Sequence, residues 1–312
     1  FCIFLVANMG GCLTPVGDPP LFMGYLRNVP FFWTMHLAPI LILNVAILMV
    51  IFFIIDNKYY KKDLANGRSP QDMLGNEHVK EPIRIDGAHN FIFLVMIVFA
   101  VLLQGLVTKL PAFMNQSTGV LTGIRVFKDI VFPWNSVLEL GIILLAAFLS
   151  LKTTKKEWHE ANDFSYAPIA EVAKLFIGIF LTMIPALALL KANGAALGLT
   201  HPAQYFWATG ALSSFLDNTP TYLVFLTTAG SVGFTSGIVT KVGIVQVADL
   251  MAISAGAVFM GANTYIGNAP NFMVKSIAEE NGVKMPSFFG YMAWSCAILL
   301  PVFVIDMFIW FW

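Results

Sequence analysis

Long apolar stretches alternate with short polar ones along the chain, and apolar stretches of roughly 20 residues can each cross ~30 Å of hydrocarbon as a helix. The continuous spans that this pattern predicts lie at residues 31–55, 90–110, 136–151, 169–190 and 286–312. Polar loops are expected between them, at residues 56–89, 111–135 and 152–168. Turn-forming pairs, Asn66-Gly67 and Ser69-Pro70, lie in the first of these loops. The pattern predicts an all-α membrane protein.

Other apolar segments are interrupted by residues that a continuous helix does not tolerate, at 8–20, 217–220 and 261–271. Proline removes a backbone donor and clashes with the preceding turn, and glycine destabilises a helix interior. Such breaks persist in a membrane only where protein or a water-filled cavity satisfies the freed backbone groups. We therefore expect each of these segments to line a protein-enclosed or hydrated site.

The middle interruption divides residues 211–226 into two arms of about ten residues, and each arm is too short to span a bilayer. We predict a re-entrant hairpin whose tip is Asp217-Asn218-Thr219-Pro220, with a kinked span as the alternative. A separate helix carrying Tyr205-Phe206-Trp207 is expected before it, at the membrane interface.

The first and last interruptions resemble each other closely, because residues 11–23 align without a gap on 261–273. Gly, Thr, Pro, Phe and Met recur in register, and Asp18 pairs with Asn268. Paired Gly/Pro-interrupted segments in two halves point to the binding site of a secondary transporter; chance similarity is the alternative. In the second half, the predicted hairpin tip at Asp217 lies 50 residues before Gly267. The corresponding hairpin of the first half, 50 residues before Gly17, would precede Phe1. We therefore expect the sequence to be N-terminally incomplete.

Acidic residues in apolar segments are costly to bury, so each is a candidate functional residue. Asp18 and Asp217 lie at backbone breaks, where a functional role is most strongly indicated. Asp249 and Asp306 are expected at the membrane interface or facing a cavity, and Glu139 is expected to cap a helix near the outer edge.

Unwound helices expose carbonyl oxygens that, together with Asn, Thr and Asp side chains, suit a hard cation such as sodium, whereas half-helix N-termini favour an anion. The predicted ion- or substrate-binding residues are Asn8, Thr14, Gly17, Asp18, Ser213, Ser214, Asp217, Asn218, Thr219, Asn263, Thr264, Gly267, Asn268 and Asn271. The predicted helix-breaking prolines are Pro15, Pro19, Pro20, Pro220 and Pro270. A sodium site is predicted at Asp217, Asn218, Asn263 and Asn268, with Asn8, Thr14 and Asp18 lining its counterpart in the first half.

Composition narrows the class of protein further. The chain is 58% hydrophobic and 12% charged, about half the charged fraction of a soluble domain. Its net charge is zero and no basic stripe occurs, so we expect no nucleic-acid partner. Three cysteines without CxxC spacing indicate neither a disulfide frame nor a zinc site, and we expect no cofactor besides a coupling ion.

Most Lys and Arg residues fall on the side of loops 56–89 and 152–168, which predicts that side to be cytoplasmic and the C-terminus to be outside.

Three motifs resemble those of the ion transporter superfamily, which includes citrate transporters, sodium–proton antiporters, arsenite permeases and sodium–dicarboxylate symporters. They are Thr14-Pro15-Val16-Gly17-Asp18-Pro19-Pro20, Ser213-Ser214-Phe215-Leu216-Asp217-Asn218-Thr219-Pro220 and Ile266-Gly267-Asn268-Ala269-Pro270-Asn271. The resemblance implies an inverted-repeat, elevator-type transporter, a homodimer through its scaffold spans, in a membrane such as the bacterial inner membrane. On this resemblance 1–56 is the transport-domain part of the first repeat, 57–89 a cytoplasmic loop, 90–193 the scaffold, and 194–312 the transport-domain part of the second repeat.

The function predicted from these features is secondary active transport rather than enzymatic catalysis. Sodium:proton antiport is the leading prediction, because it needs a carboxylate such as Asp18 or Asp217 that exchanges a proton for sodium. Sodium- or proton-coupled transport of citrate, a dicarboxylate or an arsenite-type anion is the alternative. An intramembrane aspartyl protease using Val16-Gly17-Asp18 would need Asp217 on a facing helix, and a channel would need a ring of identical ligands.

Overall fold

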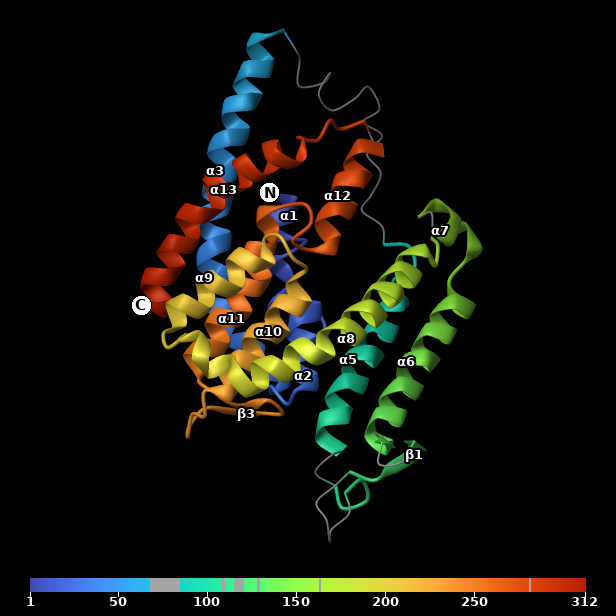
Figure 1. Cartoon of the computed structure of the whole chain (residues 1–312). Coiled ribbons are helices and arrows are strands. Elements are labelled where there is room, and N and C mark those ends of the chain that lie inside the picture. The colour runs from blue at the N-terminus through green and yellow to red at the C-terminus, as the bar shows by residue number, and fades with distance from the viewer. Residues whose placement is uncertain (68–84, 108–109, 115–120, 128–129, 163, 281) are drawn as a thin grey trace. The chain divides into compact units, whose positions relative to one another are not determined.

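The computed structural model describes residues 1–67, 85–107, 110–114, 121–127, 130–162, 164–280 and 282–312, and they are largely helical (Figure 1). The Ser69-Pro70 turn, most of the loop predicted at 56–89, and Lys109 and Lys128 lie outside the described residues. The chain divides into two compact units, one formed by residues 1–76 and 173–312 and the other by residues 77–172.

The first unit begins with a helix that is broken early. Its N-terminal elements are α1 (Cys2–Leu5), the short 3₁₀ helix η1 (Met9–Gly11), α2 (Pro19–Leu26), the 3₁₀ helix η2 (Phe31–Leu37) and α3 (Ala38–Ala65). The helix continues beyond the predicted end of the span at Ile55, because α3 runs to Ala65 through residues assigned to a loop. No glycine or proline interrupts this stretch until Gly67, whose φ of 83° lies in the left-handed region that ends helices.

The C-terminal part of this unit holds the hairpin and the second broken helix. Its elements are α8 (Ala167–Asn193, of which residues from 173 on belong here), η3 (Gly194–Leu197), α9 (Pro202–Ser213), α10 (Asn218–Ser231), β3 (Ile238–Thr240), β4 (Gly243–Val245), α11 (Val247–Met260), η4 (Gly261–Asn263), α12 (Ala269–Glu280), α13 (Phe288–Asp306) and the π-helical turn η5 (Met307–Phe311). The strands β3 and β4 pair in an antiparallel hairpin, which the hydrophobic pattern does not predict.

The aromatic-bearing helix predicted after His201-Pro202 is present, but it is not separate from the hairpin. Tyr205, Phe206 and Trp207 belong to α9, which is the first arm of the hairpin, and α10 is the second arm. Tyr205 and Phe206 are buried within the protein. The arms of 12 and 14 residues rise only about 18–21 Å, so neither crosses ~30 Å of hydrocarbon.

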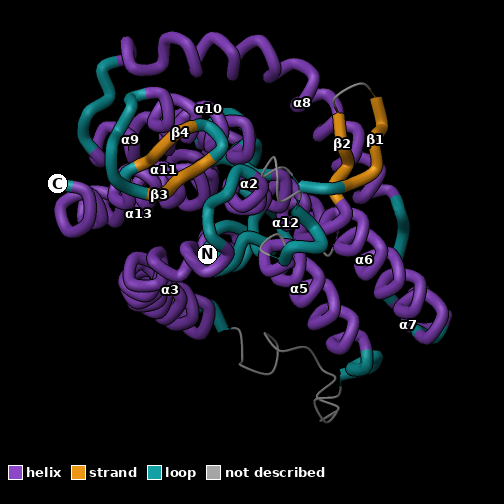
Figure 2. Tube along the Cα trace, turned by 90° about the horizontal axis from the view of Figure 1, so that it is seen from below, coloured by secondary structure: helices purple, strands orange, loops and turns teal. Residues whose placement is uncertain are grey.

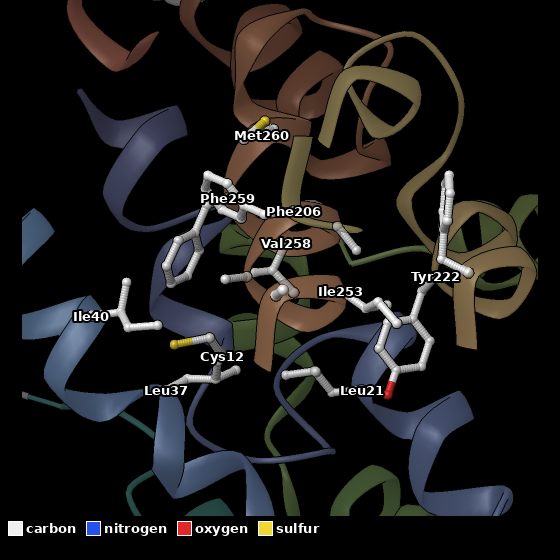
Figure 3. Close-up of a cluster of buried hydrophobic side chains, with 14 of the residues drawn as sticks. Cys12, Leu21, Leu37, Ile40, Phe206, Tyr222, Ile253, Val258, Phe259 and Met260 are labelled. Carbon is white, nitrogen blue, oxygen red and sulfur yellow. The ribbon is translucent and has the colours of Figure 1, made fainter. Parts of the chain in front are cut away.

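Helix α11 lies at the centre of this unit and contacts α2, α9, α10 and η5 (Figures 2 and 3). It carries small buried residues, which let neighbouring backbones approach closely, as is typical of helix pairs in membranes. A Cβ on Gly256 would lie 2.6 Å from the carbonyl oxygen of Phe206, so only glycine permits the observed contact with α9. Figure 3 shows Leu21 and Tyr222 beside α11 from the neighbouring elements. This packing holds both arms of the hairpin and α2 of the first broken helix against α11, which leads into the second break.

The second unit contains α5 (Asn90–Val107), β1 (Gly123–Phe127), β2 (Ile130–Pro133), α6 (Trp134–Thr153) and α7 (Lys156–Ala161). Helices α5 and α6 pack side by side (Figure 1). Ser150 donates to Asn90 Oδ1 (2.8 Å), and Gln104 Nε2 donates to Ser136 Oγ (3.1 Å), so polar side chains join both ends of the pair.

Three details of this unit differ from the prediction. The expected loop at 111–135 contains an antiparallel β1–β2 hairpin, and the expected loop at 152–168 contains α7. Glu139 lies inside α6 and does not cap it, because Pro133 occupies the N-cap and no side chain bonds the helix end. Short loop strands and single-turn helices satisfy their backbone groups locally, without leaving a periodic apolar signal.

Candidate functional site

The first helix break is built around two glycines that face each other. Between α1 and α2 the chain folds so that a Cβ on Gly11 would strike the carbonyl oxygen of Gly17, and a Cβ on Gly17 would strike that of Gly11. Asp18 is extended at the N-cap of α2, and Pro19 and Pro20 open the helix. Proline is tolerated there because its missing N–H would have no helical partner. The break is therefore encoded locally by glycine and proline.

The second break repeats this geometry at the aligned positions. Gly267 would strike the carbonyl oxygen of Gly261 if it carried a Cβ. Helix α12 begins at Ala269 as α2 begins at Pro19, and Asn271 N–H donates to the Asn268 carbonyl (3.0 Å). The gapless sequence match therefore corresponds to a shared glycine contact and a shared helix start in the two breaks.

A carbonyl at the same aligned position is also held in each break by a hydroxyl from a later element. Thr34 of η2 donates to the Leu13 carbonyl (2.7 Å), and Ser295 of α13 donates to the Asn263 carbonyl (2.5 Å). Tyr291 of α13 adds a bond to the Ala262 carbonyl (2.8 Å). These hydroxyls satisfy carbonyls that the broken helices leave free. Sequence reasoning missed them, because a single hydroxyl in an apolar helix carries no spacing signal.

The hairpin tip docks on the end of α11 and on the second break. Ser213 donates to the Ala257 carbonyl (2.6 Å) and Ser214 to the Met260 carbonyl (3.0 Å). Asn263 Nδ2 donates to Ser214 Oγ (2.9 Å), and the Thr264 hydroxyl donates to the Ser214 carbonyl. These bonds hold the tip at the break.

Three asparagine side chains tie the two breaks together. Asn8 Nδ2 donates to Asn271 Oδ1 (2.7 Å), and Asn268 Nδ2 donates to Asn8 Oδ1 (3.1 Å). All three side chains are at most 2% exposed. Residues far apart in the sequence thus meet in one buried polar joint, which we call the asparagine clamp.

Asp18 and Asn218 bring the first break to the hairpin tip. Asn218 Nδ2 donates to Asp18 Oδ1 (3.3 Å), and Asp18 is only 4% exposed. Asp18 Oδ2 and Asn263 Oδ1 are buried acceptor oxygens without a hydrogen-bond partner. Buried carboxylates require a counter-charge, a proton or several donors, so Asp18 is suited to hold a cation or a proton.

The residues predicted to form one sodium site make hydrogen bonds to other residues and not to one another. Asp217 caps α10 by accepting from Thr219 N–H (2.9 Å), while Asn218 pairs with Asp18 rather than with Asn263 or Asn268. Thr14 is exposed. The four residues of the predicted sodium site therefore each bond a different partner. In the described part of the chain, no cluster of three His, Cys, Asp or Glu side chains could hold a metal ion.

Two carboxylates expected at the membrane interface or facing a cavity are buried inside the protein. Asp249, in the first turn of α11, is 1% exposed, and Asp306, at the end of α13, is 0% exposed. The three cysteines are free. Composition cannot distinguish an interfacial from an interior acid, because both lie near the end of an apolar helix.

Five helices among the described residues are long and apolar enough to cross a membrane: Phe31–Ala65, Asn90–Val107, Trp134–Thr153, Phe176–Leu197 and Phe288–Phe311. A family model described as "Putative citrate transport" matches residues 1–311. No curated protein and no solved structure gives a significant match. The resemblance to citrate-transporter-like proteins is thereby confirmed, and the protein is an integral membrane transporter. The chain belongs to this citrate-transport family.

Proposed function

We propose that the protein is a secondary active sodium:proton antiporter, and that Asp18 with Asn218 forms its cation site. The observation that carries this proposal is the Asp18 carboxylate, buried at the meeting point of a helix break and the hairpin tip with Oδ2 unpartnered. A proton and a sodium ion would compete for the same oxygen. Exchange follows if the site faces each side of the membrane in turn, carrying sodium one way and a proton the other.

The helix N-termini near this site offer few free N–H groups to an anion. A helix N-terminus attracts an anion through free backbone N–H groups. In α2 the first two residues are prolines, and the N–H groups of Leu21 and Phe22 already donate to the Asp18 carbonyl. In α10 the Asp217 side chain takes the Thr219 N–H. The buried side-chain atoms without a partner at the junction, Asp18 Oδ2 and Asn263 Oδ1, are acceptor oxygens, which suit a cation.

Cation-coupled transport of citrate, a dicarboxylate or an arsenite-type anion is the second candidate, favoured by the family match. In this case Asp18 would hold the coupling ion, and donors outside the helix breaks would bind the anion.

The elevator arrangement belongs to the same proposal. Residues 1–56 and 194–312 would move together against scaffold spans 90–193, through which two copies would pair. The asparagine clamp and the Asp18–Asn218 hydrogen bond, which join the two segments, support a common body for them. The membrane would be a bacterial inner membrane with the C-terminus outside.

The test uses the full-length protein in proteoliposomes that contain a trapped pH dye. A sodium gradient without organic substrate should change the internal pH, and Asp18→Asn should abolish the change because it removes the titrating oxygen. Asp56→Asn, which alters an exposed carboxylate on α3, is the matched control and should behave as wild type.

Sodium-dependent citrate uptake without any pH signal would favour the second candidate over antiport. Full activity of Asp18→Asn in both assays would show that the cation site has been misplaced.

A further inference from the structure

A second buried carboxylate lies in the first unit, on helices that the proposed cation site does not use. Asp306, at the end of α13, accepts a hydrogen bond of 2.8 Å at Oδ2 from Asn44 Nδ2 of α3. Both side chains are 0% exposed. Helices α3 and α13 contact each other and lie side by side in Figure 1. The pair therefore joins the span that follows the first break to the span that follows the second.

In this pair, one oxygen atom of each side chain lacks a hydrogen-bond partner. Asp306 Oδ1 and Asn44 Oδ1 are both buried acceptors without a partner. A proton shared between these two oxygens would satisfy both of them, and so would a cation bound by both. A hard cation needs about six or more oxygen ligands. The unwound break at Asp18 can expose backbone carbonyls for this purpose, whereas Asn44 lies inside continuous α3, whose carbonyls bond within the helix. A single proton completes the arrangement with no additional group.

The geometry points to a protonated Asp306, whose Oδ1–H donates to Asn44 Oδ1 while Asn44 Nδ2 donates to Asp306 Oδ2. We propose that this cyclic pair is a proton-binding site of the transporter, separate from Asp18. A carboxylic acid and a primary amide match each other in this way, each giving one donor and one acceptor. Ionisation would leave a carboxylate in the interior with one neutral donor, which is costly without a counter-ion.

The surroundings supply no such counter-ion among the described residues. The elements that pack on α13 and η5 include α3, η4, α9 and α11. The charged and tyrosine residues of α3 lie at 56–63, about three turns or more beyond Asn44. The titratable groups of the remaining elements and of the N-cap of α9 are His201, Tyr205, Asp249, Tyr291 and Cys296. Two of them have other bonds: Tyr205 donates to the Leu199 carbonyl and Tyr291 to the Ala262 carbonyl.

The inference rests on the proposed transport function only where it assigns the proton on Asp306 a role in transport. Whether Asp306 carries a proton can be measured without transport. Infrared spectroscopy of the full-length protein in lipid, at neutral pH, resolves the carbonyl stretch of a protonated carboxyl group. Asp306→Asn should remove one such band, because an amide can replace the acid in the pair but cannot titrate. Asp56→Asn, which alters an exposed carboxylate of α3, is the control and should leave the band in place.

Asn44→Leu provides an independent arm if Asp306→Asn does not fold. It removes the amide partner, so the acid band should persist and move to higher wavenumber as its carbonyl loses a donor. Bands that are identical in wild type and both variants would overturn the proposal, whether or not the protein transports ions. If the bands behave as expected, Asp306→Asn should also change the pH dependence of transport, and an unchanged profile would show that this proton takes no part in coupling.

Discussion

Replacement of Asn8 by alanine tests whether the two helix breaks are held together by the asparagine clamp. Asn8 makes three buried hydrogen bonds, to the Ile3 carbonyl (2.7 Å), to Asn271 Oδ1 (2.7 Å) and from Asn268 Nδ2 (3.1 Å). Side-chain hydrogen bonds in membrane proteins contribute about 0.6 kcal/mol on average, and buried bonds in soluble proteins up to about 1.5 kcal/mol. Loss of all three should therefore lower the free energy of unfolding by about 2–4 kcal/mol.

The assay is equilibrium unfolding in mixed lipid–detergent micelles, followed by circular dichroism. Asn193→Ala is the matched control, because Asn193 is exposed and makes one long bond to the Leu189 carbonyl (3.3 Å); it should change stability by no more than about 0.5 kcal/mol. In a double-mutant cycle, Asn8→Ala and Asn271→Ala should couple by at least about 0.5 kcal/mol. Equal effects of Asn8→Ala and Asn193→Ala, or strict additivity in the cycle, would refute the clamp as a joint between the breaks.

Three further predictions concern the breaks and the hairpin. Gly17→Ala and Gly267→Ala should each destabilise by about 1–3 kcal/mol in the same unfolding assay, because the added methyl group meets a facing carbonyl; Gly141→Ala, in open space on α6, should be neutral or stabilising, and equal shifts in all three would contradict this reasoning. Asp217→Ala should cost about 1 kcal/mol and speed amide exchange in the first turn of α10, because it removes the helix cap; unchanged exchange would count against the cap. Ser295→Ala should destabilise by about 1 kcal/mol by freeing the Asn263 carbonyl, and wild-type stability would show that this bond contributes nothing.

The long spans and the helix breaks could be predicted because their physical causes are local. An apolar run of about 20 residues is sufficient to favour a membrane helix, and glycine with proline is sufficient to end one. The breaks predicted at 8–20 and 261–271 place the second half-helices from Leu21 and Phe272 onward, two and three residues after the observed starts at Pro19 and Ala269. Local rules failed where polar residues continue a helix, as in the last two to three turns of α3.

The partners within the candidate site could be predicted only in outline. The residue types indicated an oxygen-rich joint, but nothing in the spacing shows that Asn218 meets Asp18 or that Asn8 lies between Asn268 and Asn271. Such pairs depend on how helices distant in the sequence pack, and packing is decided by shape complementarity along α11 rather than by local preference.

The sequence by itself determined the membrane class, the positions of the two breaks and their mutual resemblance, because hydropathy and Gly/Pro chemistry act over a few neighbouring residues. Only the tertiary structure decided which polar side chains become partners and which acids lose all access to solvent. Asp306 illustrates this difference: its sequence position suggests an acid at the interface or facing a cavity, and the packing of α13 on α3 buries it against Asn44. Burial and partnership are properties of surfaces brought together by folding, so they follow from the whole arrangement of helices.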